Sequence, residues 1–216
     1  MTIAQLYDKL TTIPLFKGVS GEDLALIADR VHLRWVNVGI DQSVIQADEP
    51  CYHLTILTEG ELVRTTHYDN NTYTVKDIVK GVHIIEPEQL YGLTTRYRSS
   101  YRARTSCKML LISKDDIRKT LLNIPVWRIN LLNHLAAKYT KLQASSEQKT
   151  YNLKEMVLHF GAERPLSIRI RMEDLGRYLG AARRTISNVL HELESEGKVT
   201  LHPNLIEFNE ELGIKK

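Results

Sequence analysis

Near its C-terminal end the sequence gathers short polar and cationic side chains that could bond to a nucleic acid, in the stretch "RYLGAARRTISNVL". An arginine can donate a forked pair of hydrogen bonds to guanine, and an asparagine can form the equivalent pair with adenine. Hydroxyl groups and further arginines can bond to phosphate oxygens. The side chains that we expect to contact double-stranded DNA are Arg177, Arg183, Arg184, Thr185, Ser187 and Asn188.

Two helices are expected to position these side chains. The first carries apolar residues at helical steps, namely Met172, Leu175, Tyr178 and Leu179. We expect it to end at Gly180, because glycine adopts a left-handed conformation at little cost. The second carries its own apolar stripe, namely Ile186, Val189, Leu190 and Leu193. This spacing predicts a helix-turn-helix, and the hairpin-like segment "KVTLHPNLIEFN" after it predicts the winged form.

Positive charge is concentrated around this helix pair. Residues 164 to 191 contain six arginines and two acidic residues, whereas the whole chain has a net charge of only +3. A local excess of arginine favours DNA binding over the alternative, a basic helix that is merely solvated.

Length and composition indicate a folded protein of one or two domains. The chain has 216 residues, of which 43% are hydrophobic and 25% charged, enough to bury a core. It has no apolar run long enough for a membrane span and no secretory signal pattern. Its two cysteines, Cys51 and Cys107, fit a reducing compartment, so we expect a bacterial cytoplasmic protein.

The hydrophobic pattern changes twice along the chain. Short helices are expected over 1–32, and from Arg34 to about Ser113 short strands alternate with turns such as "YDNNTY", as in a sandwich or barrel. Residues 114 to about 146 are expected to be helical, with one break at Pro125, and the polar "QASSEQKT" that follows is a candidate hinge. A narrow apolar stripe on this helix consists of Leu132, Leu135, Tyr139 and Leu142. Its width favours a two-helix dimer seam, the alternative being packing within one domain.

In this order of segments the chain resembles the Crp/Fnr family of bacterial transcription regulators. The resemblance is carried by "IPLFKGVSGEDLALIA", "VIQADEPCYHLTILTEGELVRT", "YRARTSCKMLLISKDDIRKTL" and, most specifically, "RMEDLGRYLGAARRTISNVLHELESEGKV". It implies an α+β fold with a β-roll (a double-stranded β-helix of the cyclic-nucleotide-binding type) over 1–113, dimerisation helices and hinge over 114–150, and a winged helix-turn-helix over 151–216.

The resemblance also implies what such a protein binds. The expected partners are a second copy of the chain, RNA polymerase and a near-palindromic DNA site with half-sites about one helical turn (~34 Å) apart. Arg183, Arg184 and Asn188 match the family's base-reading positions. Well-known members have Glu at the second and Arg at the third, so the half-site here need not be the familiar one.

An effector pocket is expected in "KGVHIIEPEQLYGLTTRYRSSYRA", where cyclic-AMP-binding members hold the cyclic phosphate. The candidate residues are Glu86, Arg98, Ser99 and Ser100. Ile85 stands where a glycine would allow close backbone approach, and Pro87, acceptable as the first residue of a helix, lacks a backbone donor. We therefore expect a small-molecule effector other than cyclic AMP. The evenly spaced arginines nearby could instead form one solvated strand face.

Two other functions have different requirements. A β-roll could sense a ligand and signal through a protein partner without DNA, in which case the last helices should expose an apolar stripe. An enzyme of the β-barrel type would need a metal triad or paired carboxylates, whereas His53, His67 and His83 have no metal-ligand spacing. We expect no enzymatic activity and no metal site, and the sequence identifies no certain cofactor.

Overall fold

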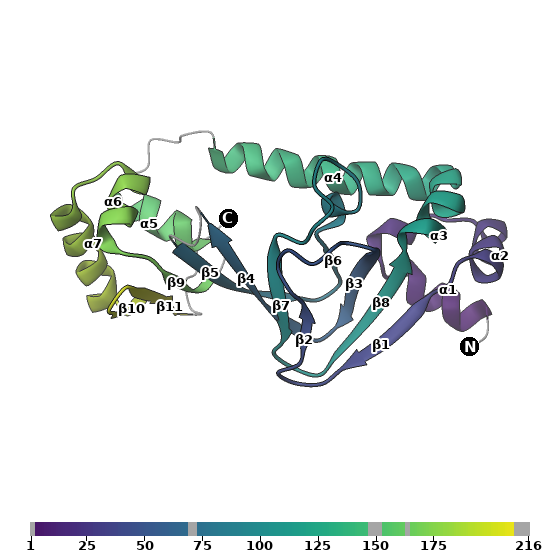
Figure 1. Cartoon of the computed structure of the whole chain (residues 1–216), viewed down its shortest axis with the longest axis horizontal. Helices are drawn as coiled ribbons and strands as arrows, with labels where there is room; N and C mark the ends of the chain where they lie inside the picture. The colour runs from purple at the N-terminus through teal and green to yellow at the C-terminus, as the bar shows by residue number, and fades with distance from the viewer. Residues whose placement is uncertain (1–2, 69–72, 147–152, 163–164, 210–216) are drawn as a thin grey trace. The chain divides into compact units, whose positions relative to one another are not determined.

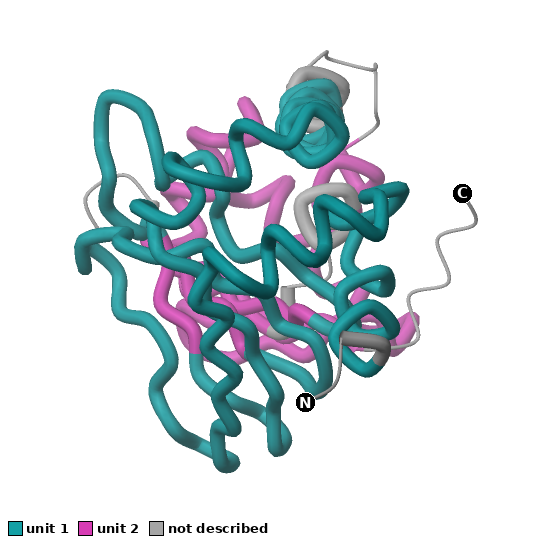
Figure 2. Tube along the Cα trace, turned by 90° about the vertical axis from the view of Figure 1, so that its right-hand side faces the viewer, with its two compact units in different colours: residues 1–62, 80–98, 102–147 teal, residues 63–79, 99–101, 148–216 magenta. Residues whose placement is uncertain are grey.

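A computed structural model describes residues 3–68, 73–146, 153–162 and 165–209 of the chain (Figure 1). By backbone contacts the chain divides into two compact units, coloured teal and magenta in Figure 2. Unit 1 comprises residues 1–62, 80–98 and 102–147, and unit 2 comprises residues 63–79, 99–101 and 148–216. The units interleave along the sequence, whereas the predicted domains follow one another. Those domain boundaries stay a prediction.

Antiparallel strands form the centre of unit 1. Its sheet has the order β1-β8-β3-β6, and the strands are β1 (Arg34–Val38), β3 (His53–Glu59), β6 (His83–Ile85) and β8 (Cys107–Ser113). The four consecutive residues of β3 from Leu54 to Leu57 are all buried, so both faces of this strand are covered. A short strand, β2 (Ser43–Ile45), also belongs to unit 1.

Helices complete unit 1. They are α1 (Ile3–Thr11), η1 (Pro14–Phe16), α2 (Gly21–Arg30), η2 (Pro87–Gln89), α3 (Lys114–Lys119), η3 (Leu121–Asn123) and α4 (Pro125–Ser146). Ser20 caps α2, because its Oγ accepts a hydrogen bond from the Asp23 N–H at 3.1 Å. The fully buried Trp127 of α4 meets the Phe16 ring edge-on, with 6.4 Å between ring centroids, and so attaches α4 to η1.

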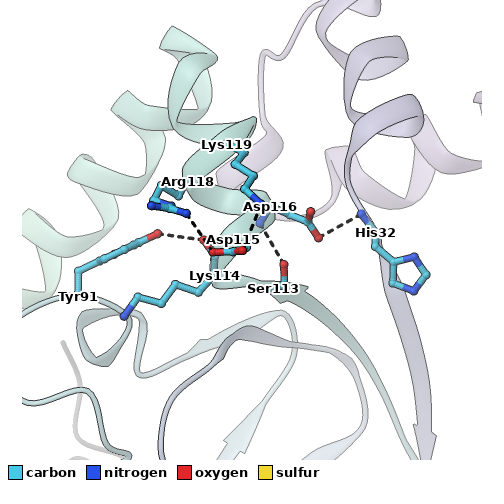
Figure 3. A network of polar contacts seen from close by, with 8 residues as sticks. All are labelled: His32, Tyr91, Ser113, Lys114, Asp115, Asp116, Arg118 and Lys119. Atoms are coloured by element: carbon cyan, nitrogen blue, oxygen red, sulfur yellow. Dashed lines mark hydrogen bonds and ion pairs between the residues drawn. The ribbon is translucent and has the colours of Figure 1, made fainter.

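A polar network fixes the start of α3 (Figure 3). The Ser113 Oγ accepts from the Asp116 N–H at 3.0 Å, which caps the helix, and the Asp116 carboxylate accepts from the His32 N–H at 3.3 Å. The Tyr91 hydroxyl donates to the Lys114 carbonyl at 3.3 Å, and the Lys114 ammonium lies 4.9 Å from the centre of the Tyr91 ring. Three segments far apart in sequence therefore meet at the junction between β8 and α4.

Unit 2 combines strands from the middle of the chain with its C-terminal part. Its strands run in the order β10-β11-β9-β5-β4-β7. They are β4 (Glu61–Tyr68), β5 (Tyr73–Lys80), β7 (Ser99–Ala103), β9 (Pro165–Arg169), β10 (Val199–His202) and β11 (Leu205–Phe208), and β4, β5 and β7 each run into unit 1 at one end. The turn predicted in "YDNNTY" includes residues 69–72, which lie outside the described residues, as do residues 147–150 of the predicted hinge.

Three helices of unit 2 enclose one apolar core with this sheet. They are α5 (Leu153–Ala162), α6 (Met172–Leu179) and α7 (Arg183–Ser195). The buried cluster consists of Val157, Ile168, Ile170, Leu175, Leu179, Ile186, Leu190, Leu193, Val199, Ile206 and Phe208. Within the described ranges, no helix has the length and apolar character needed to cross a bilayer.

Candidate nucleic-acid interface

A short turn joins α6 to α7. Gly180 ends α6 in the left-handed conformation, with φ 66° and ψ 28°, and its N–H donates to the Gly176 carbonyl, as does the Ala181 N–H at 2.9 Å. Two residues after Gly180, Ala182 is extended and its carbonyl accepts from the Ile186 N–H at 3.1 Å, which begins α7. The helix end predicted at Gly180 is thereby confirmed.

Gly176 keeps the two helices close together, a role that sequence reasoning missed. A Cβ atom on Gly176 would lie 2.7 Å from the Ala181 carbonyl oxygen, closer than real Cβ atoms approach. The turn can therefore fold back over α6 only because residue 176 has no side chain. A glycine in a helical pattern four residues before the expected helix end was the available signal.

A buried stripe fixes the orientation of α7. Ile186, Leu190 and Leu193 are fully buried in the core of unit 2. Successive residues turn about 100° around a helix, so Arg184 and Asn188 fall on the side opposite this stripe, one turn apart. The core thus holds the outer face of the first two turns in a fixed orientation.

Most of the six predicted DNA-contacting side chains are free to bind. Arg177, Arg183, Arg184, Thr185 and Asn188 are exposed, and Ser187 is half-buried. Over the described part of the chain, no hydrogen bond or ion pair engages the side chains of Arg184, Thr185, Ser187 and Asn188. Their donors and acceptors are therefore available to a partner.

The remaining two arginines are ion-paired to carboxylates of α6. Asp174 is 6% exposed and bonds to Arg171 at 2.6 Å and Arg177 at 3.2 Å, while Arg183 lies 3.7 Å from Glu173. The hydrogen bond from Arg171 lowers the pKa of the Asp174 carboxyl, against the opposing effect of desolvation. Asp174 thereby orients two cations at the edge of the exposed face, a role that sequence reasoning did not assign.

Tyr178, named among the apolar residues at helical steps on α6, does not face the core. Tyr178 is 56% exposed, whereas the adjacent Leu179 is 8% exposed and packs into the core. Since neighbouring residues are about 100° apart on a helix, only one of them can face the core fully. Tyr178 therefore adds an amphipathic side chain to the same surface as Arg177.

The β10–β11 hairpin directly follows α7, as predicted. Val199 pairs with Phe208 and His202 with Leu205, and Asn204 makes the turn with φ 58°. The Glu194 side chain of α7 accepts from the Leu201 N–H at 3.0 Å, and the Asn204 carbonyl accepts from the Ile170 N–H at 2.9 Å. The hairpin is therefore bonded both to α7 and to Ile170, between β9 and α6.

The predicted effector residues are engaged within the protein. The Glu86 carboxylate is 6% exposed and accepts from the Arg98 N–H at 2.7 Å, and Glu86 holds a left-handed φ of 38° just before η2. The Ser99 hydroxyl is buried and lies 2.8 Å from the Thr66 hydroxyl. Ser100 is half-buried on β7. Pro87 is the first residue of η2, a position that suits proline.

The evenly spaced arginines hold loops of unit 1. Arg96 donates to the Asp48 carbonyl and Arg102 to the Asp41 carbonyl. These bonds give both arginines a structural role.

A hollow of about 390 Å³ lies in unit 1 among β1, β2, β3 and β8. Its lining includes Arg34, Glu49, Thr55, Tyr97 and Met109, and none of the four predicted effector residues. In the part of the chain that the structure describes, no group of three or more His, Cys, Asp or Glu side chains could hold a metal ion.

Helix α4 exposes apolar side chains along one side. Ile129, Leu132 and Tyr139 are 52%, 55% and 62% exposed, whereas Trp127 and Leu131 are buried. Of the predicted seam, Leu135 is half-buried, and the side chain of Leu142 lies outside the described residues. The helix thus packs on unit 1 with one side and presents an apolar strip with another.

At the level of sequence, no family model and no curated protein matches this chain significantly. Solved structures match its fold over most of its length. A transcriptional regulator of the Crp/Fnr family from Eubacterium rectale is 15% identical, with a TM-score of 0.56 over 92% of this chain and 94% of that one. The Thermus thermophilus catabolite activator protein is 19% identical, with a TM-score of 0.51 over 91% and 94%. The c-di-GMP-responsive global regulator CLP of Xanthomonas campestris is 14% identical, with a TM-score of 0.52 over 88% and 99%.

Proposed function

We propose that this chain, which has the α+β fold of the Crp/Fnr regulators, is a homodimeric transcription regulator of the bacterial cytoplasm that binds a near-palindromic DNA site. In this proposal α6 and α7 are a helix-turn-helix, α7 is the recognition helix and the β10–β11 hairpin is the wing. The observation that carries the proposal is the outer face of α7. There Arg184 and Asn188 are exposed, have no bonding partner among the described residues and are backed by a fully buried apolar stripe.

Each side chain has a defined role in this proposal. Arg184 and Asn188 read base edges in the major groove, with Arg183 beside them. Arg177, Thr185 and Ser187 bond to phosphates and set the register. A side chain that recognises bases in the major groove should have hydrogen-bond donors that stay hydrated until DNA binds. The side chains on α7 that have no bonding partner within the described residues meet this requirement.

The proposed dimer is supported by α4. Two copies of the strip Ile129, Leu132 and Tyr139 could pack against each other and place two recognition helices on one face of the DNA. RNA polymerase is proposed as a further partner, through which bound protein would affect transcription.

The alternative function, ligand sensing by the β-roll with signalling through a protein partner, is less well supported. A protein-docking tail should expose an apolar stripe on its last helices. The outer face of α7 instead presents Arg184, Asn188 and His191, and the exposed large apolar side chain of α6 is Tyr178.

The test is selection from a random duplex DNA library, followed by affinity measurements on the enriched sequence. The wild-type protein should enrich a near-palindrome with half-sites about one helical turn (~34 Å) apart. Arg184→Ala and Asn188→Ala should each weaken binding about tenfold or more and relax one base position. Arg30→Ala removes an exposed charge on α2 and is the matched control. Failure to enrich any motif, or an unchanged motif in both variants, would refute the proposal.

An effector-sensing role for the β-roll is part of the proposal. Cyclic AMP is not the expected effector, since the Glu86 carboxylate already bonds to the Arg98 N–H. Because the similar regulator CLP responds to c-di-GMP, calorimetric titrations should include cyclic AMP, cyclic GMP and c-di-GMP. Saturable micromolar binding of cyclic AMP would contradict the expectation.

A further inference from the structure

Strand β9 pairs on both sides, and one of its partners comes from the middle of the chain. On one side Ile168 pairs with Ile206 of β11. On the other it pairs with Val75 of β5, a strand some ninety residues earlier in the sequence. The paired residues of β5 and β9 lie in unit 2, the magenta unit of Figure 2. Strands from the middle of the chain therefore extend the sheet that holds the proposed wing.

The pairing buries apolar surface as well as backbone. Val75 packs against the cluster formed by α5, α6, α7 and the wing, in which Ile168 is fully buried. The remaining register aligns Thr74 with Arg169, Lys76 with Ser167 and, past a bulge, Asp77 with Pro165. Strand β5 is thus part of the core that fixes α7.

Strand β5 is also bonded on its other side, to β4. Arg64 of β4 donates from its Nε to both carboxylate oxygens of Asp77, at 2.9 and 3.1 Å, and Asp77 is 5% exposed. Strand β4 is joined in turn to β7, because the buried hydroxyl groups of Thr66 on β4 and Ser99 on β7 are hydrogen-bonded to each other. One run of strands therefore leads from Ser99, a predicted effector residue, through β4 and β5 to β9 and the wing.

We propose that the edge of β9 opposite β11 is a strand-addition site for β5 of the same chain, and that this pairing controls DNA affinity. The inference rests on the proposed function. Pairing removes orientational freedom from the recognition helix, so a paired dimer loses less entropy when both helices dock. An effector that shifts β7 and β4 would change the population of the paired state and hence the affinity.

The first experiment tests the pairing without DNA. In the full chain, Lys76→Cys with Ser167→Cys places two thiols at directly opposed positions, where a disulfide can form. The native Cys51 and Cys107 are buried and should not interfere. Mild oxidation should give the intramolecular 76–167 crosslink in most molecules. The matched control is Lys76→Cys with Thr200→Cys, which are not opposed. A 76–167 crosslink that forms no more often than the control crosslink would overturn the inference.

The second experiment tests the coupling. Val75→Asp places a carboxylate against the apolar cluster and should weaken binding to the selected DNA at least tenfold, whereas Lys76→Ala, on the same strand, should stay within twofold. Hydrogen exchange should show faster exchange at 167–169 with α7 still protected, which separates lost pairing from unfolding. The oxidised crosslink should bind DNA at least as tightly as the reduced form.

The outcomes separate the two proposals. If the oxidised crosslink loses DNA binding, or if Val75→Asp exposes 167–169 without changing affinity, the coupling is wrong while DNA binding stands. If the wild-type chain selects no DNA, the proposed function fails and the coupling to DNA affinity fails with it, whereas the crosslink and exchange results still decide whether β5 occupies the β9 edge.

Discussion

Replacing Gly176 with alanine tests the close approach of α6 to the turn, and two effects of opposite sign compete. In a helix interior alanine is favoured over glycine by about 1 kcal/mol. The new Cβ, however, would lie 2.7 Å from the Ala181 carbonyl oxygen, and ordinary contacts begin at 3.4 Å, so the turn must move by about 0.7 Å. Overpacking of this kind costs about 1–3 kcal/mol. We expect the steric effect to dominate, with a net loss of about 1 kcal/mol in the free energy of unfolding.

Two other glycines serve as controls for this substitution. A Cβ atom added at Gly21 or at Gly180 would meet no other atom within 4 Å, but Gly180 has a φ of +66°. Gly21→Ala should leave the unfolding free energy unchanged or raise it slightly. Gly180→Ala should cost about 1 kcal/mol through backbone strain alone.

Urea unfolding and fluorescence anisotropy with the selected DNA provide the assay. Because the displaced turn leads directly into Arg183, Gly176→Ala should weaken DNA binding beyond its effect on stability. If Gly176→Ala is as stable as Gly21→Ala and binds DNA like the wild type, the reasoning about this contact is wrong.

Three further predictions concern charge, assembly and pH. Arg177→Ala should reduce the slope of log affinity against log salt by about 1, unlike Arg30→Ala, and an unchanged slope would remove Arg177 from the phosphate contacts. Leu132→Glu should convert the proposed dimer to a monomer in light scattering, whereas Leu93→Glu, at a fully exposed position outside α4, should not. A Leu132→Glu variant that stays dimeric would contradict the proposed dimer seam on α4. Because the pKa of Asp174 is lowered in the folded state, its contribution to stability is complete above its ordinary pKa of 3.8 and is lost as pH falls through the lowered value. Acid titration of unfolding should therefore be shallower in Asp174→Asn, and identical curves would argue against this ion pair.

Local patterns in the sequence predicted local structure well. The glycine that ends α6, the hairpin after α7 and the helical break at Pro125, where α4 begins, each depend on a few neighbouring residues. Conformational preferences of single residue types decide such features. The resemblance to the Crp/Fnr family, carried by the order of these segments, is confirmed for the fold.

Position on a helix face was harder to predict. Tyr178 and Leu179 are adjacent, and both continue an apolar pattern at helical steps. Only the direction of the core, which the rest of unit 2 determines, places Leu179 inside and Tyr178 outside.

Long-range contacts were beyond the sequence patterns. The pairing of β5 with β9 joins segments some ninety residues apart, and nothing in either strand identifies its partner. The bond from the Arg98 N–H to Glu86 likewise depends on how the chain folds back at η2. Five of the six candidate DNA-contacting residues lie on α7, so a local pattern could group them, whereas the effector residues come from segments whose approach depends on the whole fold. Both sets stay predictions.

The acidic residues of α6 act as built-in counterions. Asp174 bonds to Arg171 and Arg177, and Glu173 lies beside Arg183, so part of the arginine charge is neutralised before any nucleic acid arrives. Attraction to an arbitrary duplex depends on net positive charge, whereas base recognition depends on a few well-placed donors such as Arg184. A regulator with this balance would bind random genomic sequence less tightly, so that base recognition would supply a larger share of its affinity for the operator.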